Sequence, residues 1–383
     1  MRALHVITGL GVGGAEQQLR LLLRHLPIGC DVVTLTNPGA VAAGIRDDGR
    51  RVAHLGMAGN RDVTALPRLA RLVRTGGYDL VHTHLYRACV YGRLAARLAG
   101  VRAVVATEHS LGAARIEGRP LTASARALYL ATERLGGATV AVSATVARRL
   151  REWGVPPPRI ELVPNGIEPA RFRFDPAARR EARARLGLPG DAFVVGGVGR
   201  LVPGKRFDVL LRAVAALPGA RLLLVGEGPE RPALRQLAVR LGAADRICLP
   251  GERDGAVADG GPPGEPSLPA LLAAMDVFAS PSDEEAFGLA VLEALAAGLP
   301  VRHVTCPAVD ELPSAAAPGA RRVGPHAADL ARAVREVRDA RLPRQPVPAA
   351  VARYDIARSA DRLMSLYAAV HGRAATTPSH RER

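Results

Sequence analysis

Short apolar runs alternate with amphipathic helical segments along this chain, and the alternation occurs in two successive series. The first series has strand-like runs at residues 3–8, 32–35, 80–83, 101–106 and 139–142. The second has runs at residues 193–199, 221–225, 246–249 and 277–279. Such alternation is typical of an α/β fold with a parallel sheet covered by helices. Two series predict two doubly wound, Rossmann-like domains that face each other across a cleft.

The length and apolar content of the chain support two domains. The chain has 383 residues, 48% of them hydrophobic, which is enough to fill two cores. A proline-bearing stretch at 164–176 separates the two series, so we expect domains at 1–169 and 170–353. The segment 257–269 is rich in glycine and proline and is predicted to be a mobile surface loop. The tail at 372–383 is predicted to be disordered.

Several protein classes are disfavoured by composition. No apolar run reaches the roughly 18 residues that a membrane-spanning helix needs, and the first residues lack the pattern of a signal peptide. The four cysteines are far apart and form no CxxC pair, so neither a disulfide framework nor a zinc site is indicated. We therefore expect a cytoplasmic protein.

The formal net charge is +16, and residues 1–170 carry +10 of it, because 22 arginines there outnumber 12 acidic residues. Aromatic residues make up only 3% of the chain, and the arginines are not gathered around stacking rings, so nucleic acid is not an expected partner. An anionic small ligand, or peripheral contact with the inner face of an anionic membrane, fits better. Among the 52 basic residues Lys205 is the only lysine.

A glycine loop follows the first strand. The segment from Gly9 to Gly14 matches GxGxxG and opens a helix, so its amide groups could hold a diphosphate. A dinucleotide site would also need an acidic residue at the end of the second strand, where this chain has Thr36, Asn37 and Pro38. This mismatch disfavours a nicotinamide or flavin cofactor.

Two cations follow the first strand of the second series. Arg200 and Lys205 come directly after the run 193–199 and before a helical pattern at 207–215. The carboxyl ends of parallel strands are where open α/β sheets bind ligands, and a helix amino terminus adds positive potential. The alternative is two solvated surface charges, which the single lysine makes less favourable.

Acidic residues lie on both sides of a second strand-to-helix junction. Glu285 precedes the apolar helical segment 289–297, and Glu293 lies inside that segment. Helical side chains lean toward the amino terminus, so Glu293 is expected to project toward the loop that holds Glu285. Two carboxylates there suit sugar hydroxyls, and the free amides near Phe287 and Gly288 suit phosphate. The alternative is a structural pairing of Glu293 with a buried arginine.

Histidines follow two strands of the first series. His109 comes after the run 101–106, and His82 and His84 come after Leu80. Their spacing is not that of a metal site, and the chain contains no DxD triplet. For His82 a satisfied core histidine is the better interpretation, whereas His109 is equally compatible with a core or a functional role.

Seven short segments, in order along the chain, resemble the family 4 glycosyltransferases, which are retaining enzymes of the GT-B fold. The segments are Gly13-Gly-Ala-Glu16, Val81-His-Thr-His84, Thr107-Glu-His109, Val163-Pro-Asn-Gly-Ile167, Gly199-Arg-Leu with Lys205, Val225-Gly-Glu-Gly-Pro229, and Glu285-Ala-Phe-Gly288 followed by Glu293-Ala-Leu295. Each segment alone is a weak signal. Their shared order and spacing over nearly the whole chain make the resemblance specific.

The resemblance implies a role for each matching residue. It implies that Arg200 and Lys205 hold the donor diphosphate and that Glu293 binds the ribose. Glu285 would contact the transferred sugar, together with the amide groups at the start of the following helix, those of Phe287, Gly288 and Leu289.

The resemblance also assigns roles to the first domain. His109 would approach the sugar from the opposing domain, and the loop of Gly13 and Gly14 would approach the phosphates. The last helix, about 354–370, would return to the first domain. No metal and no cofactor is implied, because the nucleotide-diphosphate sugar is a substrate.

The expected function is therefore transfer of a sugar, with retention, to a lipid-linked, saccharide or small-molecule acceptor, such as a polysaccharide, glycolipid or natural-product precursor.

One segment departs from the family pattern: after Val301 the chain runs through Arg302 to Pro307, where a glycine-containing turn is usual. This departure leaves one alternative, a nucleotide-sugar-binding protein without catalysis. A second alternative is a nucleotide-sugar epimerase of the same fold, which would use the same phosphate site without a second substrate.

Overall fold

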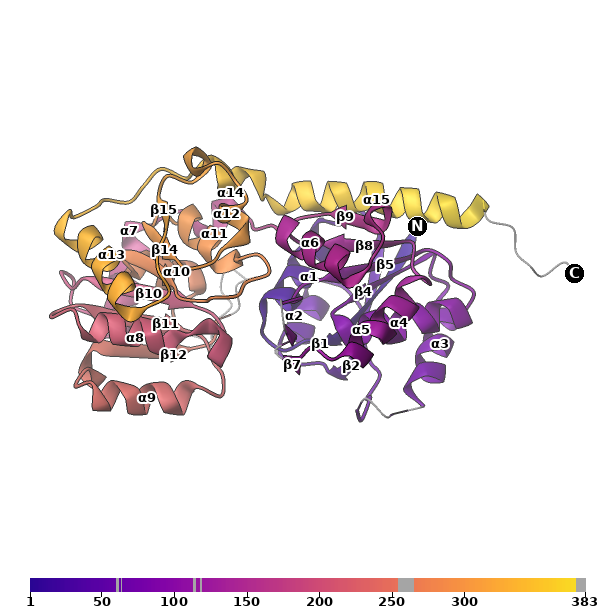
Figure 1. Cartoon of the computed structure of the whole chain (residues 1–383), viewed down its shortest axis with the longest axis horizontal. Coiled ribbons are helices and arrows are strands. Elements are labelled where there is room, and N and C mark those ends of the chain that lie inside the picture. Colours follow the sequence, from indigo (N-terminus) through magenta and orange to yellow (C-terminus); the bar gives the residue numbers. More distant parts are fainter. Residues whose placement is uncertain (60–61, 63, 113–114, 118, 254–264, 377–383) are drawn as a thin grey trace, which may run out of the picture. The chain divides into compact units, whose positions relative to one another are not determined.

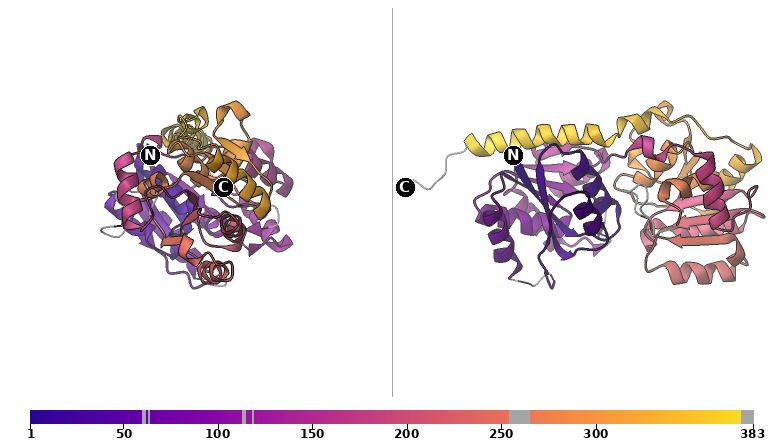
Figure 2. Two further views of the ribbon diagram at one scale, coloured as in Figure 1. Left: turned by 90° about the vertical axis from the view of Figure 1, so that its left-hand side faces the viewer. Right: turned by 180° about the vertical axis from the view of Figure 1, so that it is seen from behind.

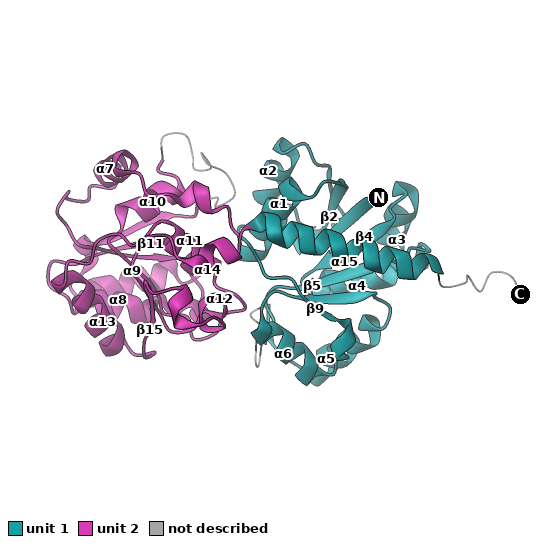
Figure 3. Cartoon of the chain, turned by 90° about the horizontal axis from the view of Figure 1, so that it is seen from above, with its two compact units in different colours: residues 1–166, 356–383 teal, residues 167–355 magenta. Residues whose placement is uncertain are grey.

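The computed structural model describes residues 1–59, 62, 64–112, 115–117, 119–253 and 265–376. The chain forms two compact units (Figure 3). Unit 1 contains Met1–Gly166 and Ile356–Arg383, and unit 2 contains Ile167–Asp355. The chain therefore passes between the units twice.

Unit 1 is built on a seven-stranded parallel sheet with the order β3-β2-β1-β4-β5-β8-β9. Its strands are β1 (Arg2–Gly9), β2 (Gly29–Asn37), β3 (Val52–His54), β4 (Leu80–His84), β5 (Val104–Glu108), β8 (Ala138–Ala141) and β9 (Ile160–Leu162). Its helices are α1 (Gly14–His25), α2 (Val41–Asp47), α3 (Ala65–Gly76), α4 (Tyr86–Leu98), α5 (Ala123–Glu133), α6 (Ala144–Trp153), η1 (Pro157–Arg159) and α15 (Ile356–Thr376). A small hairpin joins β6 (Arg115–Ile116) to β7 (Arg119–Pro120).

Alternate residues of β1 contribute to two different hydrophobic cores. Ala3 and Ile7 belong to a core shared with α1, α2 and α15, and Leu4 and Val6 belong to a core shared with α3 and α4. This alternation is the period of two of a β-strand, and it shows that helices cover both faces of the sheet. The long helix α15, which ends the described chain, lies along unit 1 (Figures 1 and 2).

Unit 2 contains a six-stranded parallel sheet with the order β12-β11-β10-β13-β14-β15. Its strands are β10 (Val194–Val198), β11 (Arg221–Val225), β12 (Ile247–Gly251), β13 (Val277–Ser280), β14 (Val301–His303) and β15 (Ala320–Arg322). Its helices are η2 (Pro169–Phe172), α7 (Pro176–Arg185), η3 (Pro203–Lys205), α8 (Phe207–Ala215), α9 (Arg231–Arg240), η4 (Ala244–Arg246), α10 (Leu268–Ala274), α11 (Leu289–Ala296), α12 (Pro307–Asp310), η5 (Ser314–Ala316), α13 (Ala327–Asp339) and α14 (Ala349–Arg353).

The chain's end is more regular than its sequence predicts. Disorder from residue 372 was expected, but α15 continues to Thr376, because the alanine-rich end of this segment has high helix propensity; residues 377–383 lie outside the described part. Most of the expected loop at 257–269 also lies outside the described residues, and α10 begins at Leu268. No described helix is both long and apolar enough to cross a membrane.

Candidate functional site

The strand order of unit 2 changes direction at β10, which lies between β11 and β13. Because β10 and β13 are parallel neighbours, the segments that follow their carboxyl ends meet at the same edge of the sheet. Lys205 ends η3 after β10, and Glu285 follows β13; the Lys205 ammonium forms a salt bridge with the Glu285 carboxylate. The two side chains are 27% and 15% exposed, so a ligand can reach the pair.

The loop that carries Arg200 is held by a second, glycine-bearing loop. The Leu201 amide donates to the Glu227 carbonyl at 2.8 Å, and the Gly199 amide donates to the Val225 carbonyl at 3.0 Å. Gly226 has φ +148°, and a Cβ atom there would collide with the Gly199 carbonyl oxygen. Arg200 itself is exposed and forms no ion pair with the residues that the structure describes. Its position is therefore set by its backbone.

The amino terminus of α11 presents free backbone amides beside this pair. Gly288 caps the helix with φ +107°, and a Cβ atom there would collide with the Cys306 sulfur. Within the described residues, the amides of Phe287, Gly288 and Leu289 donate to no acceptor. Burial, with the charge of Glu285 adding to it, raises the pKa of the Cys306 thiol strongly, which places Glu285 near this helix start. Free amides and the helix dipole favour an anion here.

Glu293 lies on α11, one turn after Leu289, and is partly buried. Burial raises the pKa of its carboxyl to about 7, although the positive charge of Arg171 on η2 acts in the opposite direction. The position of Arg171 agrees in part with the alternative that Glu293 pairs with an arginine for structural reasons. A partly buried carboxylate is costly unless it accepts hydrogen bonds, and the hydroxyl groups of a ligand can donate them. The carboxyl oxygens of Glu293 therefore remain suited to ligand hydroxyls.

In unit 1, four histidines share one face of the sheet. His5 on β1 is in register with His82 on β4, and His82 and His84 are two residues apart, so all three side chains lie on the side of α1 and α15. Thr107 on β5 pairs with His84 in register, and His109 follows two residues later on the same side. The period of two thus gathers four imidazoles that are far apart in the sequence.

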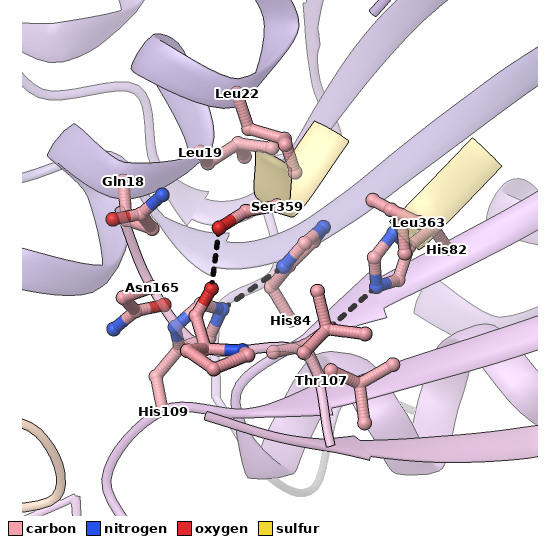
Figure 4. A pocket seen from close by; sticks show the side chains of 13 residues that line it. Gln18, Leu19, Leu22, His82, His84, Thr107, His109, Asn165, Ser359 and Leu363 are labelled. Atoms are coloured by element: carbon pink, nitrogen blue, oxygen red, sulfur yellow. Dashed lines mark hydrogen bonds between the residues drawn. The ribbon is translucent and has the colours of Figure 1, made fainter. Parts of the chain in front are cut away.

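Hydrogen bonds connect these rings to each other and to hydroxyls. His84 contacts His5 (Nε2 to Nδ1, 3.0 Å) and His109 (Nδ1 to Nε2, 3.1 Å), as Figure 4 shows in part. Both ring nitrogens of His82 lie 2.6 Å from hydroxyl oxygens, Oη of Tyr367 and Oγ1 of Thr107. His82 is therefore a satisfied core residue.

Nitrogen atoms of His5, His82 and His84 lie within 4.8 Å of one another, a separation also compatible with a metal ion. Hydrogen bonds account for Nδ1 of His5 and for both ring nitrogens of His82 and of His84. We therefore describe the group as a hydrogen-bonded cluster.

A small cavity of about 30 Å³ lies beside His109 (Figure 4). Its polar lining residues are Gln18, His82, His84, Thr107, His109, Asn165 and Ser359. Gln18 of α1 accepts a hydrogen bond from the Gly166 amide at 3.2 Å. At the amino terminus of the same helix, Gly13 is the cap residue and Gly14 is exposed, so this loop is open to solvent.

The segment after Val301 has an ordered structure of its own. Arg302 and His303 complete β14, which begins at Val301, and the buried His303 ring contacts the Asp310 carboxylate at 2.9 Å. Burial alone would raise the pKa of Asp310, but hydrogen bonds from His303 and the Cys306 amide lower it. This carboxylate therefore orders the turn that carries Cys306 to the start of α11.

Sequence profiles of two families match the chain. The profile described as Glycosyltransferase Family 4 matches residues 12–171, and the profile described as Glycosyl transferases group 1 matches residues 192–339. The chain belongs to glycosyltransferase family 4. The predicted family is thus confirmed.

Curated relatives include two enzymes named D-inositol 3-phosphate glycosyltransferase. That of Saccharomonospora viridis is 36% identical over 248 residues, 59% of this chain and 54% of the relative. That of Acidothermus cellulolyticus is 37% identical over 262 residues, 62% of this chain and 54% of the relative. The chain spans about half the length of the curated relatives it matches.

Solved structures confirm the predicted GT-B fold. HepE from Anabaena, crystallised with UDP, has a TM-score of 0.80 at 22% identity, covering 96% of this chain and 100% of HepE. Sucrose-phosphate synthase from Thermosynechococcus elongatus has a TM-score of 0.68 at 22% identity, covering 98% of both chains. At these identities the likeness shows the fold alone.

Within each unit, some of the predicted site residues come together. Lys205 and Glu285 form an ion pair, and His84 contacts His109. Sequence reasoning missed His5, because a single histidine in an apolar strand gives no signal by itself. The signal appears once β1 and β4 are placed in register, because His5 then lies on the same face of the sheet as His82 and His84.

Proposed function

We propose that this family 4 protein is a retaining, metal-independent glycosyltransferase that moves a hexose from a nucleoside-diphosphate sugar to an acceptor. The observation that carries the proposal is the Lys205–Glu285 pair at the change of strand order in unit 2, beside the free amides of α11. An open α/β sheet binds its ligand at such a point.

The chemistry expected of this arrangement is stabilisation of the leaving group. An ammonium has three N–H donors, so Lys205 can keep Glu285 and still donate to a phosphate oxygen. Arg200, held by its loop, and the amides of Phe287 and Gly288 add further positive potential. Preorganised donors aimed at developing negative charge are commonly the largest contribution to catalysis. Glu285 would face the transferred sugar and Glu293 the ribose.

Metal independence is supported by the pairing of the acidic residues in the loop before α11. Glu285 pairs with Lys205, and Asp283 lies 3.5 Å from the Arg206 guanidinium. A carboxylate neutralised by a cation is a weaker ligand for Mg²⁺ or Mn²⁺ than a free one. The cations of the chain would therefore perform the role that a metal performs elsewhere.

Two aspects of substrate identity draw support from the comparisons. HepE was crystallised with UDP-glucose as well as UDP, so we infer a UDP-linked hexose as the first donor to test. The names of the curated relatives favour a small, phosphorylated polyol among the acceptor classes expected from the sequence. The net charge of +16 suits such an anionic acceptor and would also suit contact with the cytoplasmic face of an anionic membrane.

A thermal-shift screen against UDP, GDP, ADP, CDP and dTDP tests the donor site. A nucleotide at about 100 times its dissociation constant stabilises the folded state by about 2.7 kcal/mol. For domains of this size each kcal/mol raises the melting temperature by about 2–4 °C, so the expected rise is about 5–11 °C. The largest shift is expected with UDP. A shift with NAD or NADP, and with none of the five diphosphates, would contradict the proposal.

Product analysis separates glycosyl transfer from the alternatives. The protein is supplied with a nucleotide sugar whose nucleotide binds in the screen and with a set of polyol phosphates. A retaining transferase then yields free nucleoside diphosphate and a new glycoside of unchanged anomeric configuration. An epimerase would convert the nucleotide sugar without an acceptor, and a non-catalytic binder would return all substrates unchanged.

A further inference from the structure

Three histidine rings of unit 1 are joined head to tail. Nδ1 of His5 contacts Nε2 of His84 at 3.0 Å, and Nδ1 of His84 contacts Nε2 of His109 at 3.1 Å. At both contacts, Nδ1 of one ring meets Nε2 of the next ring. The rings stack along the way, with centroids 5.3 and 5.4 Å apart.

All three rings are neutral at physiological pH. Burial lowers the pKa of His5 to about 3 and that of His109 to about 4, and burial together with the neighbouring imidazoles lowers the pKa of His84 well below its ordinary value. A neutral imidazole carries one proton on its two nitrogens, so one nitrogen donates and the other accepts.

Neutrality and head-to-tail geometry together restrict the protons. Each contact needs one N–H and one lone pair, because two facing N–H groups would clash and two facing lone pairs would leave both nitrogens unsatisfied. If Nδ1 of His5 carries the proton, then Nδ1 of His84 and Nδ1 of His109 must carry theirs. If Nε2 of His109 carries the proton instead, then Nε2 of His84 and Nε2 of His5 must carry theirs.

We infer that His5 and His84 are positioning residues that set the tautomer and the ring orientation of His109, because the three rings share one tautomer. The catalytic consequence of this arrangement rests on the proposed function and on the expectation, drawn from the family resemblance, that His109 approaches the transferred sugar. The tautomer decides whether Nδ1 of His109 donates a hydrogen bond or accepts one.

The two ends of the chain of rings support this inference. Nδ1 of His109 and Nε2 of His5 are buried, and within the described residues neither has a hydrogen-bond partner. A buried polar atom without a partner in a native protein calls for a water or a ligand. The cavity of about 30 Å³ that His109 and His84 help to line has room for a water or a single hydroxyl. A partner for Nε2 of His5 would set the tautomer of His84 and, through His84, that of His109.

His82 provides the internal control. It lies on the same face and is as buried as His5 and His84, but its partners are the hydroxyls of Tyr367 and Thr107. A hydroxyl both donates and accepts, so these contacts impose no tautomer on His82. Loss of His82 therefore perturbs the core without breaking the chain of rings.

Nitrogen-15 NMR of the histidine-labelled protein tests the inference without any substrate. Pyrrole-type and pyridine-type ring nitrogens have well-separated resonances, and the His5→Gln, His84→Gln and His109→Gln variants assign the three rings. We expect His5, His84 and His109 all to carry Nδ1–H or all to carry Nε2–H. Different tautomers among the three, or an imidazolium at neutral pH, would overturn the inference.

Two substitutions of His84 differ in whether they keep the contact with His109. In His84→Gln the amide can reach the position of Nε2 and lose the contact with His109, whereas in His84→Asn it can replace Nδ1 and keep that contact. We expect the His109 resonances to change in both variants and to stay unchanged in His82→Gln. If His109 keeps its wild-type tautomer in His84→Gln, the inference is wrong.

Kinetics then measure the consequence for the reaction. We expect His84→Gln to lower kcat about 10–100-fold with little change in the donor KM, the range seen when groups that orient metal-bound histidines are removed. His84→Asn should recover part of this loss. Shared tautomers in a protein that transfers no sugar would refute the proposed function and leave the inference about the rings intact. Unchanged kcat in His84→Gln would refute the positioning role.

Discussion

Lys205 is the residue at which composition and geometry agree. All the other basic residues of the chain, histidine aside, are arginines. The single lysine lies at the change of strand order and reaches Glu285. An ammonium is a compact charge that can follow a departing phosphate oxygen, whereas a guanidinium is a wide planar group that needs a matched pair of acceptors. We therefore attribute this lysine to function.

Substitution of Lys205 tests that attribution. We expect Lys205→Ala to lower kcat about 10²–10³-fold, because one preorganised donor to developing charge is worth about 2.7–4 kcal/mol. Lys205→Arg should recover only part of the loss. The measurement is turnover with the donor found in the nucleotide screen, and the melting temperature without ligand serves as the control for folding. Wild-type turnover in Lys205→Ala would refute the site.

At this scale the sequence indicates single residues better than their partners. The positions of Arg200, Lys205 and Glu285 after strands follow from the apolar runs alone. The contact between Lys205 and Glu285 also requires that β10 and β13 be neighbours, which is a property of the strand order. His5 could not be assigned for the same reason, since its partner His84 is 79 residues away.

At the scale of elements, apolar runs predict the strands that carry them and miss strands that are exposed or polar. Residues 221–225 coincide with β11, whereas β3, β9, β14 and β15 were not expected. The edge strands β3 and β9 are three residues long and mostly exposed, so they show no apolar run. In β14 the buried polar residues Arg302 and His303 conceal the pattern; Arg302 donates to the carbonyls of Val301 and Ala333, and His303 contacts Asp310.

The loop from Gly226 to Gly228 is the element on which the position of Arg200 depends, and Gly226→Ala tests it. The new Cβ would collide with the Gly199 carbonyl oxygen at a φ of +148°, so the two loops must separate. We expect weaker nucleotide binding and a loss of stability above the roughly 1 kcal/mol typical of a left-handed alanine.

Gly242→Ala is the matched control, because Gly242 has φ +61° and open space around its Cα atom. This variant should lose only the backbone contribution to stability and bind nucleotide normally. Isothermal titration with the preferred diphosphate and thermal melts compare the two variants. Equal nucleotide affinity in Gly226→Ala and the wild type would contradict the role of this loop.

At the scale of the whole molecule, the last described helix completes the unit in which the chain began. The apolar residues of α15 belong to the core that contains β1 and α1, and they are Ile356, Ala360, Leu363, Leu366, Tyr367 and Val370. Tyr367 also provides the hydroxyl partner of Nδ1 of His82. Helical periodicity alone identifies the helix, but it does not indicate which unit the apolar face covers.

Truncation after Asp355 tests this dependence. Each fully buried large apolar side chain contributes about 1.5–3 kcal/mol, so removing the helix takes away an amount comparable with the roughly 5–15 kcal/mol by which a domain is stable. We expect unit 1 to unfold while unit 2, whose core contains no residue of α15, stays folded. Hydrogen exchange read by mass spectrometry should show protection lost in residues 1–166 and kept in 167–355. Truncation after Thr376 is the control and should leave both units protected. If residues 1–166 remain protected without α15, the core of unit 1 does not depend on the helix, and its packing against α1 is incidental to the fold.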